Sequence, residues 1–108
     1  MIYMHVKCDF DHEDQPIEIY SEMDDDRNEI RKVHFFSNGE CEIASKYFET
    51  VYTGLSSEPL PSVEEINADG QFFARLISSH EFEIQWEKEF KKNIYFRFDF
   101  DGNREGSR

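Results

Sequence analysis

The chain has 108 residues, the size of one domain, and a formal net charge of −12. A surface this negative repels nucleic acid and anionic membranes, and it attracts basic partners. Its eleven Phe, five Tyr and one Trp are more than a disordered acidic chain would carry, so the composition predicts a folded core. No stretch reaches the ~20 apolar residues of a membrane span or resembles a signal peptide, and we therefore expect a cytoplasmic protein.

The first half of the chain alternates apolar and polar residues, which is the pattern of β-strands. The triplet Asp24-Asp25-Asp26 predicts a turn, because aspartate side chains accept hydrogen bonds from nearby backbone. Asn38-Gly39 predicts a hairpin, because both residues accept positive φ. This half therefore predicts an antiparallel meander of four strands, at residues 2–8, 17–23, 28–37 and about 40–47.

Two capping boxes in the second half predict helices. Ser62 with Glu65, and Ser78 with Glu81, have the spacing at which a serine and a glutamate satisfy each other's backbone N–H groups. The first helix is expected at about 63–68, ended by Asp69-Gly70, and the second at about 79–92, ended by Asn93.

An apolar stripe marks the second helix, because Phe82, Trp86 and Phe90 stand at i, i+4 and i+8. This stripe should pack across one face of the sheet. Residues 72–77 are expected to be extended, and the alternation over residues 94–100 predicts a final strand.

The order of the elements predicts an α+β fold, since strands precede helices without a βαβ rhythm. We expect an antiparallel sheet of four to six strands that begins with the N-terminal meander. One short helix and one longer C-terminal helix should be packed on one face. Residues 1–100 should form a single domain, and residues 101–108 a flexible C-terminal tail.

Negative charge is concentrated between residues 9 and 29, where ten acidic residues accompany Arg27 alone and carry −9 of the −12. A passive solvated face is one interpretation, and a binding surface is the other. The leading hypothesis is a binding protein and not an enzyme. It would be an immunity protein that covers the active site of a basic bacterial toxin, most concretely a nuclease, whose Lys and Arg hold phosphates. The residues predicted to bind the partner are Asp9, Asp11, Glu13, Asp14, Tyr20, Glu22, Asp24, Asp25 and Asp26, with exposed Tyr3 as a second aromatic anchor beside Tyr20.

Other classes of function stay open at this point. One is a regulatory or accessory protein-interaction domain unrelated to toxins. Another is a small hydrolase that uses paired carboxylates with a metal. We expect a monomer or weak dimer, and an exposed edge at residues 94–100 would move the interface away from the acidic segment.

No metal or cofactor is expected. His5, Cys8, His12 and Cys41 could supply zinc ligands, but His5 and Cys8 should point to opposite faces of one strand. The acids from Asp9 onward begin like a calcium loop, but the glycine and glutamate that such a loop needs are missing. Both cysteines should be thiols, because a disulfide needs an oxidising compartment.

Three basic residues, Arg27, Arg31 and Lys32, follow the aspartate triplet closely. They could form ordinary cross-strand or turn ion pairs, which stabilise little at a surface. Alternatively, Arg27 and Arg31 could order the triplet into a fixed shape for an interface.

Three segments together resemble a known family: residues 19–33 (IYSEMDDDRNEIRKV), residues 58–69 (EPLPSVEEINAD), and Phe82-Glu83 with Trp86-Glu87. They resemble an uncharacterised family of small bacterial domains of unknown function. The similarity covers about residues 2–92, and the strand and tail after it look like an addition. Families of this kind are common among immunity proteins of toxin systems, so the resemblance implies that role as an expectation.

Overall fold

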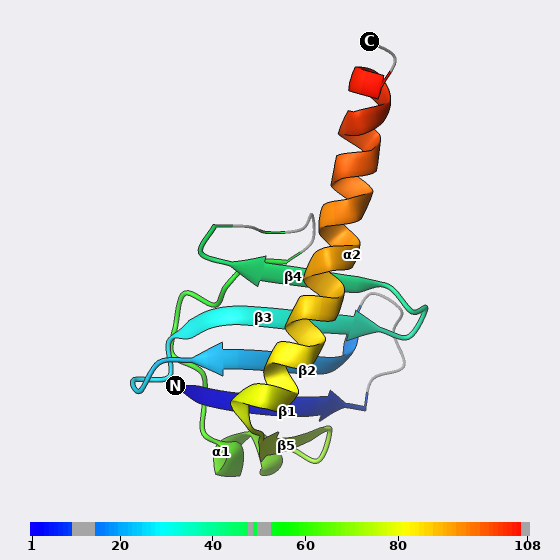
Figure 1. Cartoon of the computed structure of the whole chain (residues 1–108). Helices are drawn as coiled ribbons and strands as arrows, with labels where there is room; N and C mark the ends of the chain where they lie inside the picture. Colours follow the sequence, from blue (N-terminus) through cyan, green and yellow to red (C-terminus); the bar gives the residue numbers. More distant parts are fainter. Residues whose placement is uncertain (10–14, 48, 50–52, 107–108) are drawn as a thin grey trace.

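A five-stranded antiparallel sheet forms the centre of the molecule, with the strand order β4-β3-β2-β1-β5 (Figure 1). The computed structural model describes residues 1–9, 15–47, 49 and 53–106, with side chains described as far as Lys92. The predicted four-strand meander is confirmed, and a fifth strand pairs with β1 on its other side. The elements are β1 Ile2–Cys8, β2 Pro16–Met23, β3 Glu29–Phe36, β4 Cys41–Ser45, α1 Val63–Asn67, β5 Phe72–Leu76 and α2 Ser79–Gly106.

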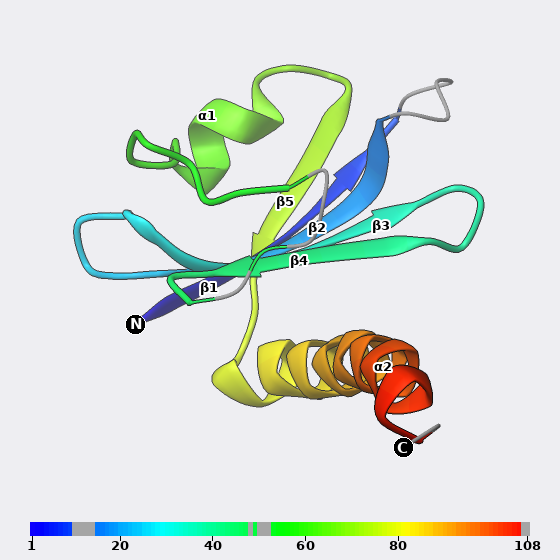
Figure 2. The same ribbon diagram turned by 90° about the horizontal axis from the view of Figure 1, so that it is seen from above.

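The two helices cover opposite faces of this sheet (Figure 2). Because side chains alternate along a strand, each face has its own apolar cluster. Met4, Val6 and Met23 are buried on the face where α1 packs. Val33 and Ile43 are buried on the other face, beneath α2. The long C-terminal helix therefore crosses one face as expected. The expectation that both helices pack on one face is wrong, because each face of the sheet has its own apolar cluster and α1 packs on the face opposite α2.

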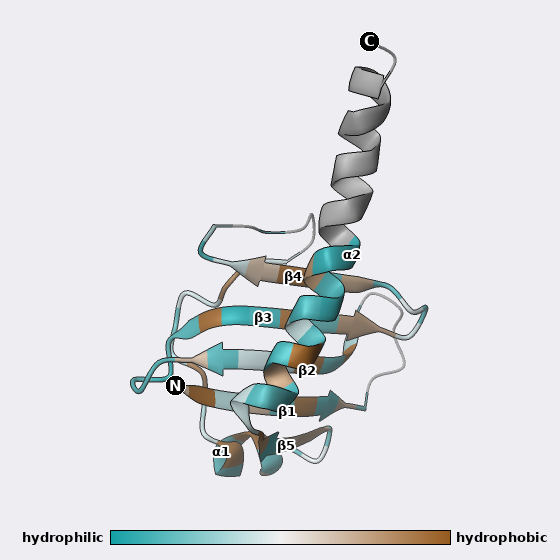
Figure 3. Cartoon of the chain, in the orientation of Figure 1, coloured by the Kyte–Doolittle hydropathy of each residue, from teal (hydrophilic) through white to brown (hydrophobic). Residues whose placement is uncertain are grey.

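The half of α2 that lies on the sheet is anchored by the predicted apolar stripe. Phe82 is fully buried, and its ring stacks on Trp86 at 6.4 Å between centroids, while Trp86 stacks on Phe90 at 5.6 Å. The side of α2 that faces away from the sheet is mostly hydrophilic in this stretch (Figure 3). The predicted capping box is confirmed, since the Glu81 N–H donates to Ser78 Oγ at 3.1 Å and the Ser78 N–H donates to Glu81 Oε1 at 3.4 Å.

Beyond the sheet, α2 continues where a strand was expected. Asn93 does not end the helix, which continues to Gly106. Residues 94–100 are therefore helical, and the predicted final strand is wrong. Asn is only a weak helix breaker, and no Gly or Pro precedes residue 102 in this helix. A helix also satisfies its own backbone hydrogen bonds, whereas a strand needs a partner. Residues 101–106, which were expected to belong to a flexible tail, are also part of this helix. Because residues 94–100 form no strand, the interface expected at an exposed strand edge there is not supported.

The outer edge of β5 is protected by one side chain from α1. Asn67 Oδ1 accepts a hydrogen bond from the Ala74 N–H at 2.6 Å, and Asn67 Nδ2 donates to the Ala74 carbonyl at 3.0 Å. The amide thus pairs with both backbone groups of Ala74 as a neighbouring strand would. Such blocking of an edge strand disfavours pairing with another chain.

Candidate functional site

The hairpin turn between β2 and β3 is organised by Asp24. Its Oδ1 accepts from the N–H groups of Asp26 and Asn28, each at 2.9 Å, and its Oδ2 accepts from Asn28 Nδ2 at 3.2 Å. The backbone hydrogen bond from Asn28 is the main reason why the pKa of Asp24 lies below its ordinary value. The predicted turn is confirmed. Asp25 and Asp26 are exposed on it, while the carboxylate of Asp24 is occupied within the turn.

Arg27 joins this hairpin to the segment that leads into α1. Its Nε donates to the Leu60 carbonyl at 2.8 Å, its Nη2 donates to the Pro61 carbonyl, and the Leu60 N–H donates to the Arg27 carbonyl at 2.9 Å. Arg27 has a φ of 68°, in the left-handed region that non-glycine residues rarely occupy. The contacts differ from both roles expected for Arg27, because its guanidinium binds carbonyls of another segment and not the aspartate triplet.

This link brings acidic residues from two parts of the sequence to one end of the molecule (Figure 2). Among the described residues, the exposed carboxylates on the hairpin and around α1 have one cationic contact within 4.0 Å. This contact is the terminal amine, which lies 3.8 Å from Asp25. Arg27, the nearby guanidinium, is engaged by carbonyl groups. We call this surface the acidic end; its members are Asp25, Asp26, Glu58, Glu64 and Glu65.

The predicted acidic site does not form one surface among the described residues. Asp9 is exposed, but it follows the far end of β1, whereas the hairpin lies beside the start of β1. Its N–H donates to the Gln71 carbonyl at 2.8 Å. The predicted residues Asp11, Glu13 and Asp14 lie outside the described part of the chain.

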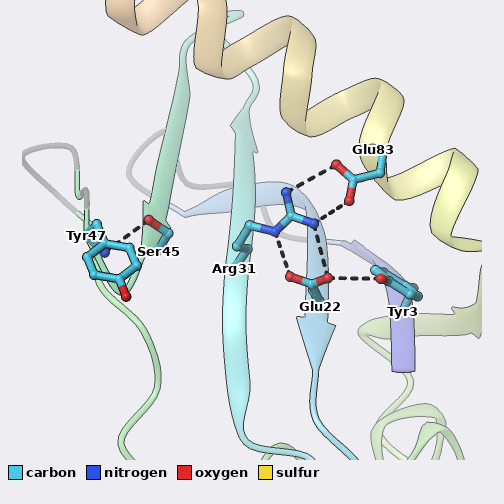
Figure 4. Close-up of polar contacts among 6 residues, drawn as sticks. All are labelled: Tyr3, Glu22, Arg31, Ser45, Tyr47 and Glu83. Carbon is cyan, nitrogen blue, oxygen red and sulfur yellow. Dashed lines mark hydrogen bonds and ion pairs between the residues drawn. The ribbon is translucent and has the colours of Figure 1, made fainter. Parts of the chain in front are cut away.

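Glu22 belongs to a partly buried network beneath α2 (Figure 4). Arg31 donates to it from Nε at 2.6 Å and from Nη2 at 3.1 Å, and the Tyr3 hydroxyl donates to Glu22 Oε2 at 2.9 Å. Arg31 also donates from Nη1 to Glu83 Oε1 of α2 at 3.1 Å and pairs through Nη2 with Glu83 Oε2. The Arg31 guanidinium is 4.9 Å from the ring of Phe82, within cation–π range. The network therefore fastens α2 to three strands.

The charges in this network hold one another ionised. Burial alone would raise the pKa of Glu22, but hydrogen bonds from Arg31 and Tyr3 and the charge of Arg31 outweigh burial, so the pKa lies below its ordinary value. Burial alone would lower the pKa of Arg31, but hydrogen bonds and charge from Glu22 and Glu83 raise it. Glu22 and Arg31 thus act in the fold. Arg31 forms the expected cross-strand ion pair, opposite Glu22 in the register of β2 and β3, but the pair is largely buried and Arg31 does not order the aspartate turn.

The two tyrosines expected as exposed anchors are half-buried. Tyr20 stacks on His5 at 4.4 Å between centroids and meets the edge of Phe35 at 5.9 Å. Tyr3 packs on Phe82 at 5.5 Å. Their alternation in the strands was read correctly, but the face that they occupy is an apolar layer beneath α2 and not a free surface.

A pocket of about 360 Å³ lies on the other face, between α1 and the sheet. Sequence patterns gave no indication of it, because its walls come from β1, β2, β3 and the region around α1. Its volume falls in the range of small-ligand sites, about 300–1,000 Å³. Its apolar wall is formed by Met4, Val6, Ile19, Leu60, Ile66 and Phe72.

A buried ion pair lies in the wall of this pocket. The Glu29 side chain is 2% exposed and pairs with Lys32 Nζ at 3.0 Å. Glu29 also accepts from Ser21 Oγ at 3.1 Å and from the Ser56 N–H at 2.8 Å. A buried charge is tolerated when it is paired and hydrogen-bonded in this way, so the carboxylate is fully occupied by protein groups.

His34 lines the same pocket as a neutral imidazole at pH 7. Burial, assisted by the charge of Lys32, lowers its pKa from 6.5 to about 4. The unfolded chain therefore binds a proton at a higher pH than the folded chain does. We expect the free energy of unfolding to fall as the pH drops from 6.5 towards 4, by at most about 1.4 kcal/mol per pH unit for this one group, and to be unaffected by it above 6.5.

Urea unfolding of the wild type and of His34→Gln at about pH 7 and about pH 5 tests this expectation. The wild type should lose stability between the two values, and the variant should lose less. Carboxylates with lowered pKa, such as Asp24 and Glu22, respond mainly below about pH 5 and are common to both proteins. Equal losses in the two proteins would show that His34 does not titrate in this window.

Neither cysteine is placed for a disulfide or a zinc site. Cys8 is buried on the α1 face and Cys41 packs on the α2 face, so both are free. Burial raises the pKa of both thiols. His5 lies on the face opposite Cys8, as predicted, and within the described ranges no group of three or more His, Cys, Asp or Glu could hold a metal ion. His12 is outside these ranges.

A family model for a domain of unknown function, DUF6881, matches residues 2–91. The chain belongs to the DUF6881 family. The predicted resemblance to an uncharacterised family is thereby confirmed, and residues 92–108 of this DUF6881 protein lie beyond the matched region. Neither the curated proteins nor the solved structures include a match to the chain. In the part of the chain that the structure describes, no helix is both long and apolar enough to cross a membrane.

Proposed function

We propose that this DUF6881 protein is a small acidic binding protein, and most concretely an immunity protein that covers the active site of a basic bacterial toxin with nuclease activity. The acidic end is the observation that supports the proposal. Asp25 and Asp26 are exposed there beside the carboxylates around α1, while the nearby Arg27 is engaged by backbone carbonyls. The five carboxylates of the acidic end outnumber this guanidinium and the terminal amine, so the surface has a net negative charge for a partner.

The acidic end is suited to a nuclease because such enzymes hold phosphates with Lys and Arg. Carboxylates on a firm hairpin and on the first turn of a capped helix can occupy those cationic groups in place of phosphate. The hydrogen bonds of Asp24 and Arg27 fix both segments, which reduces the entropy lost on binding. Long-range attraction should mainly speed association and weaken as salt increases.

Co-expression identifies the partner. The C-terminal region of the protein encoded immediately upstream is produced in bacteria with and without the DUF6881 protein. Toxicity alone and survival together would support the immunity role. A harmless upstream product would contradict this pairing and favour the alternative of a regulatory or accessory interaction domain.

Charge reversal then tests the surface. We expect Asp25→Lys with Asp26→Lys to weaken binding of the partner about tenfold or more at low ionic strength, mainly through the association rate. The matched control is Glu40→Lys with Glu87→Lys, which makes the same change in charge at exposed positions away from the acidic end. Stopped-flow or biosensor kinetics give both rates. Equal losses in the two double variants would contradict this placement of the interface.

A further inference from the structure

The pocket between α1 and the sheet adjoins the acidic end. Glu65 belongs to both, since it is exposed on α1 and also lines the pocket beside Leu60 and Ile66. A partner that covers the acidic end therefore also meets the pocket. Most of its wall is apolar, which suits an apolar side chain or a short hydrocarbon.

The charged residues that line the pocket determine which charge a ligand can have beside its apolar group. Three carboxylates, Glu29, Glu65 and Asp69, face a single ammonium, Lys32. Lys32 is already paired with Glu29, and His34 is neutral at pH 7 because burial lowers its pKa to about 4. The lining residues thus have an excess of two negative charges. The Arg27 guanidinium, which binds the carbonyls of the lining residues Leu60 and Pro61, offsets one of them. Hydrogen bonds with Ser62 and the charge of Arg27 lower the pKa of Glu65, and the remaining excess disfavours a carboxylate or phosphate ligand.

The two carboxylates nearest the surface keep capacity to bind. Glu65 Oε1 accepts from the Ser62 N–H at 3.1 Å, and Asp69 Oδ1 accepts from the Gln71 N–H at 3.2 Å. Both side chains are exposed, and among the described residues neither carboxylate forms an ion pair within 4.0 Å. Both side chains are therefore fixed by their own turns and still available to a cation.

We infer that this pocket receives an apolar side chain of the basic partner, together with an adjoining lysine or arginine whose charge Glu65 and Asp69 hold. The inference rests on the proposed function and names the anchor subsite of that interface. Apolar anchors that fill a pocket at an interface contribute much of the binding energy, whereas charges at the rim set the preference for a partner.

Three probes with the same hydrocarbon chain test the inference without any partner protein. Hexylamine, hexanol and hexanoate are titrated at neutral pH and low ionic strength, and the NMR signals of the Ile19, Leu60 and Ile66 methyl groups report binding. We expect hexylamine to bind about fivefold more tightly than hexanoate, with hexanol between them, and the difference to shrink in high salt.

Charge-neutral variants provide the matched comparison. Glu65→Gln keeps the capping box, since glutamine serves at this position, and Asp69→Asn keeps an oxygen for the Gln71 N–H. In this double variant the preference for hexylamine should disappear while the affinity for hexanol stays the same. Glu40→Gln with Glu87→Gln, which removes the same charge elsewhere, should leave the preference intact.

Three results would overturn the inference: tightest binding by hexanoate, a preference for hexylamine that survives in the Glu65/Asp69 variant, or no methyl shifts with any probe. Each of these concerns the pocket alone. The proposed function fails separately, through the rescue assay and the reversal of Asp25 and Asp26, so the two failures are distinguishable.

Discussion

Replacement of Arg31 by methionine is expected to lower the free energy of unfolding by about 3–5 kcal/mol, because it leaves the buried Glu22 without its cation. Glu22 is 7% exposed, and Arg31 is its only cationic contact among the described residues. The substitution also removes the guanidinium from the rings of Phe82 and Trp86, at 4.9 and 5.0 Å. Small domains are typically stable by about 5–15 kcal/mol, so this single change should remove much of the stability.

Arg75→Met provides the control for this prediction. Arg75 pairs with Glu81 at 3.4 Å, but both side chains are about half exposed, at 55% and 48%. An exposed pair contributes roughly 0–1 kcal/mol, so the control should change stability little. Urea unfolding followed by far-UV circular dichroism gives both values without relying on Trp86 fluorescence, which the loss of Arg31 would disturb. Similar losses for the two arginines would mean that the Arg31 network is no stronger than a surface pair.

Phe82→Ala is expected to cost about 3–5 kcal/mol, the usual loss for a fully buried phenylalanine. Phe82 is 0% exposed and touches Tyr3 of β1 as well as Trp86 of its own helix. The cavity left by the ring would lie between α2 and the sheet. Loss of the ring also removes one of the two aromatic surfaces that contact Arg31.

The control for Phe82 is two residues further along the same helix. Ile84 is 50% exposed, so Ile84→Ala should change stability by about 0.5 kcal/mol or less. Urea midpoints and slopes measured in parallel separate lost packing from a change in cooperativity. If Ile84→Ala were as damaging as Phe82→Ala, the helix would be packed through a different face from the one described.

Local sequence signals predicted most of the fold because the forces behind them act within a few residues. Asp24 closes its own turn, Ser62 and Ser78 cap the helices that follow them, and Phe82 and Trp86 share a helix face through their spacing alone. The prediction of a strand at residues 94–100 is wrong because alternating aromatic residues fit a strand as well as a helix. A segment of this kind forms a strand and not a helix only where a free edge of the sheet can pair with it. Whether such an edge exists depends on the whole sheet and not on the local sequence.

The candidate site was predicted less well, because its geometry depends on contacts between distant segments. The acidic turn was located, but the link from Arg27 to Leu60 and the pairing of Arg31 with Glu83 join residues 33 and 52 positions apart. Charge in the sequence also gave no measure of burial, so Glu22 was grouped with Asp25 although one stabilises the core and the other is exposed. The pocket beside α1 was missed for the same reason.

The strand order has a consequence for how the protein emerges during synthesis. β1 is made first, yet one of its edges is paired only when β5, at Phe72–Leu76, has followed it. Val33 and Ile43 are likewise covered only after the stretch that holds Phe82 and Trp86 has left the ribosome. A nascent chain that ends after β4 would therefore carry an open edge and a bare apolar face, both of which favour aggregation. The fold is thus completed only when nearly all of the family-matched region has been made. Until then, the open strand edge and the uncovered apolar face are the surfaces that a chaperone would bind.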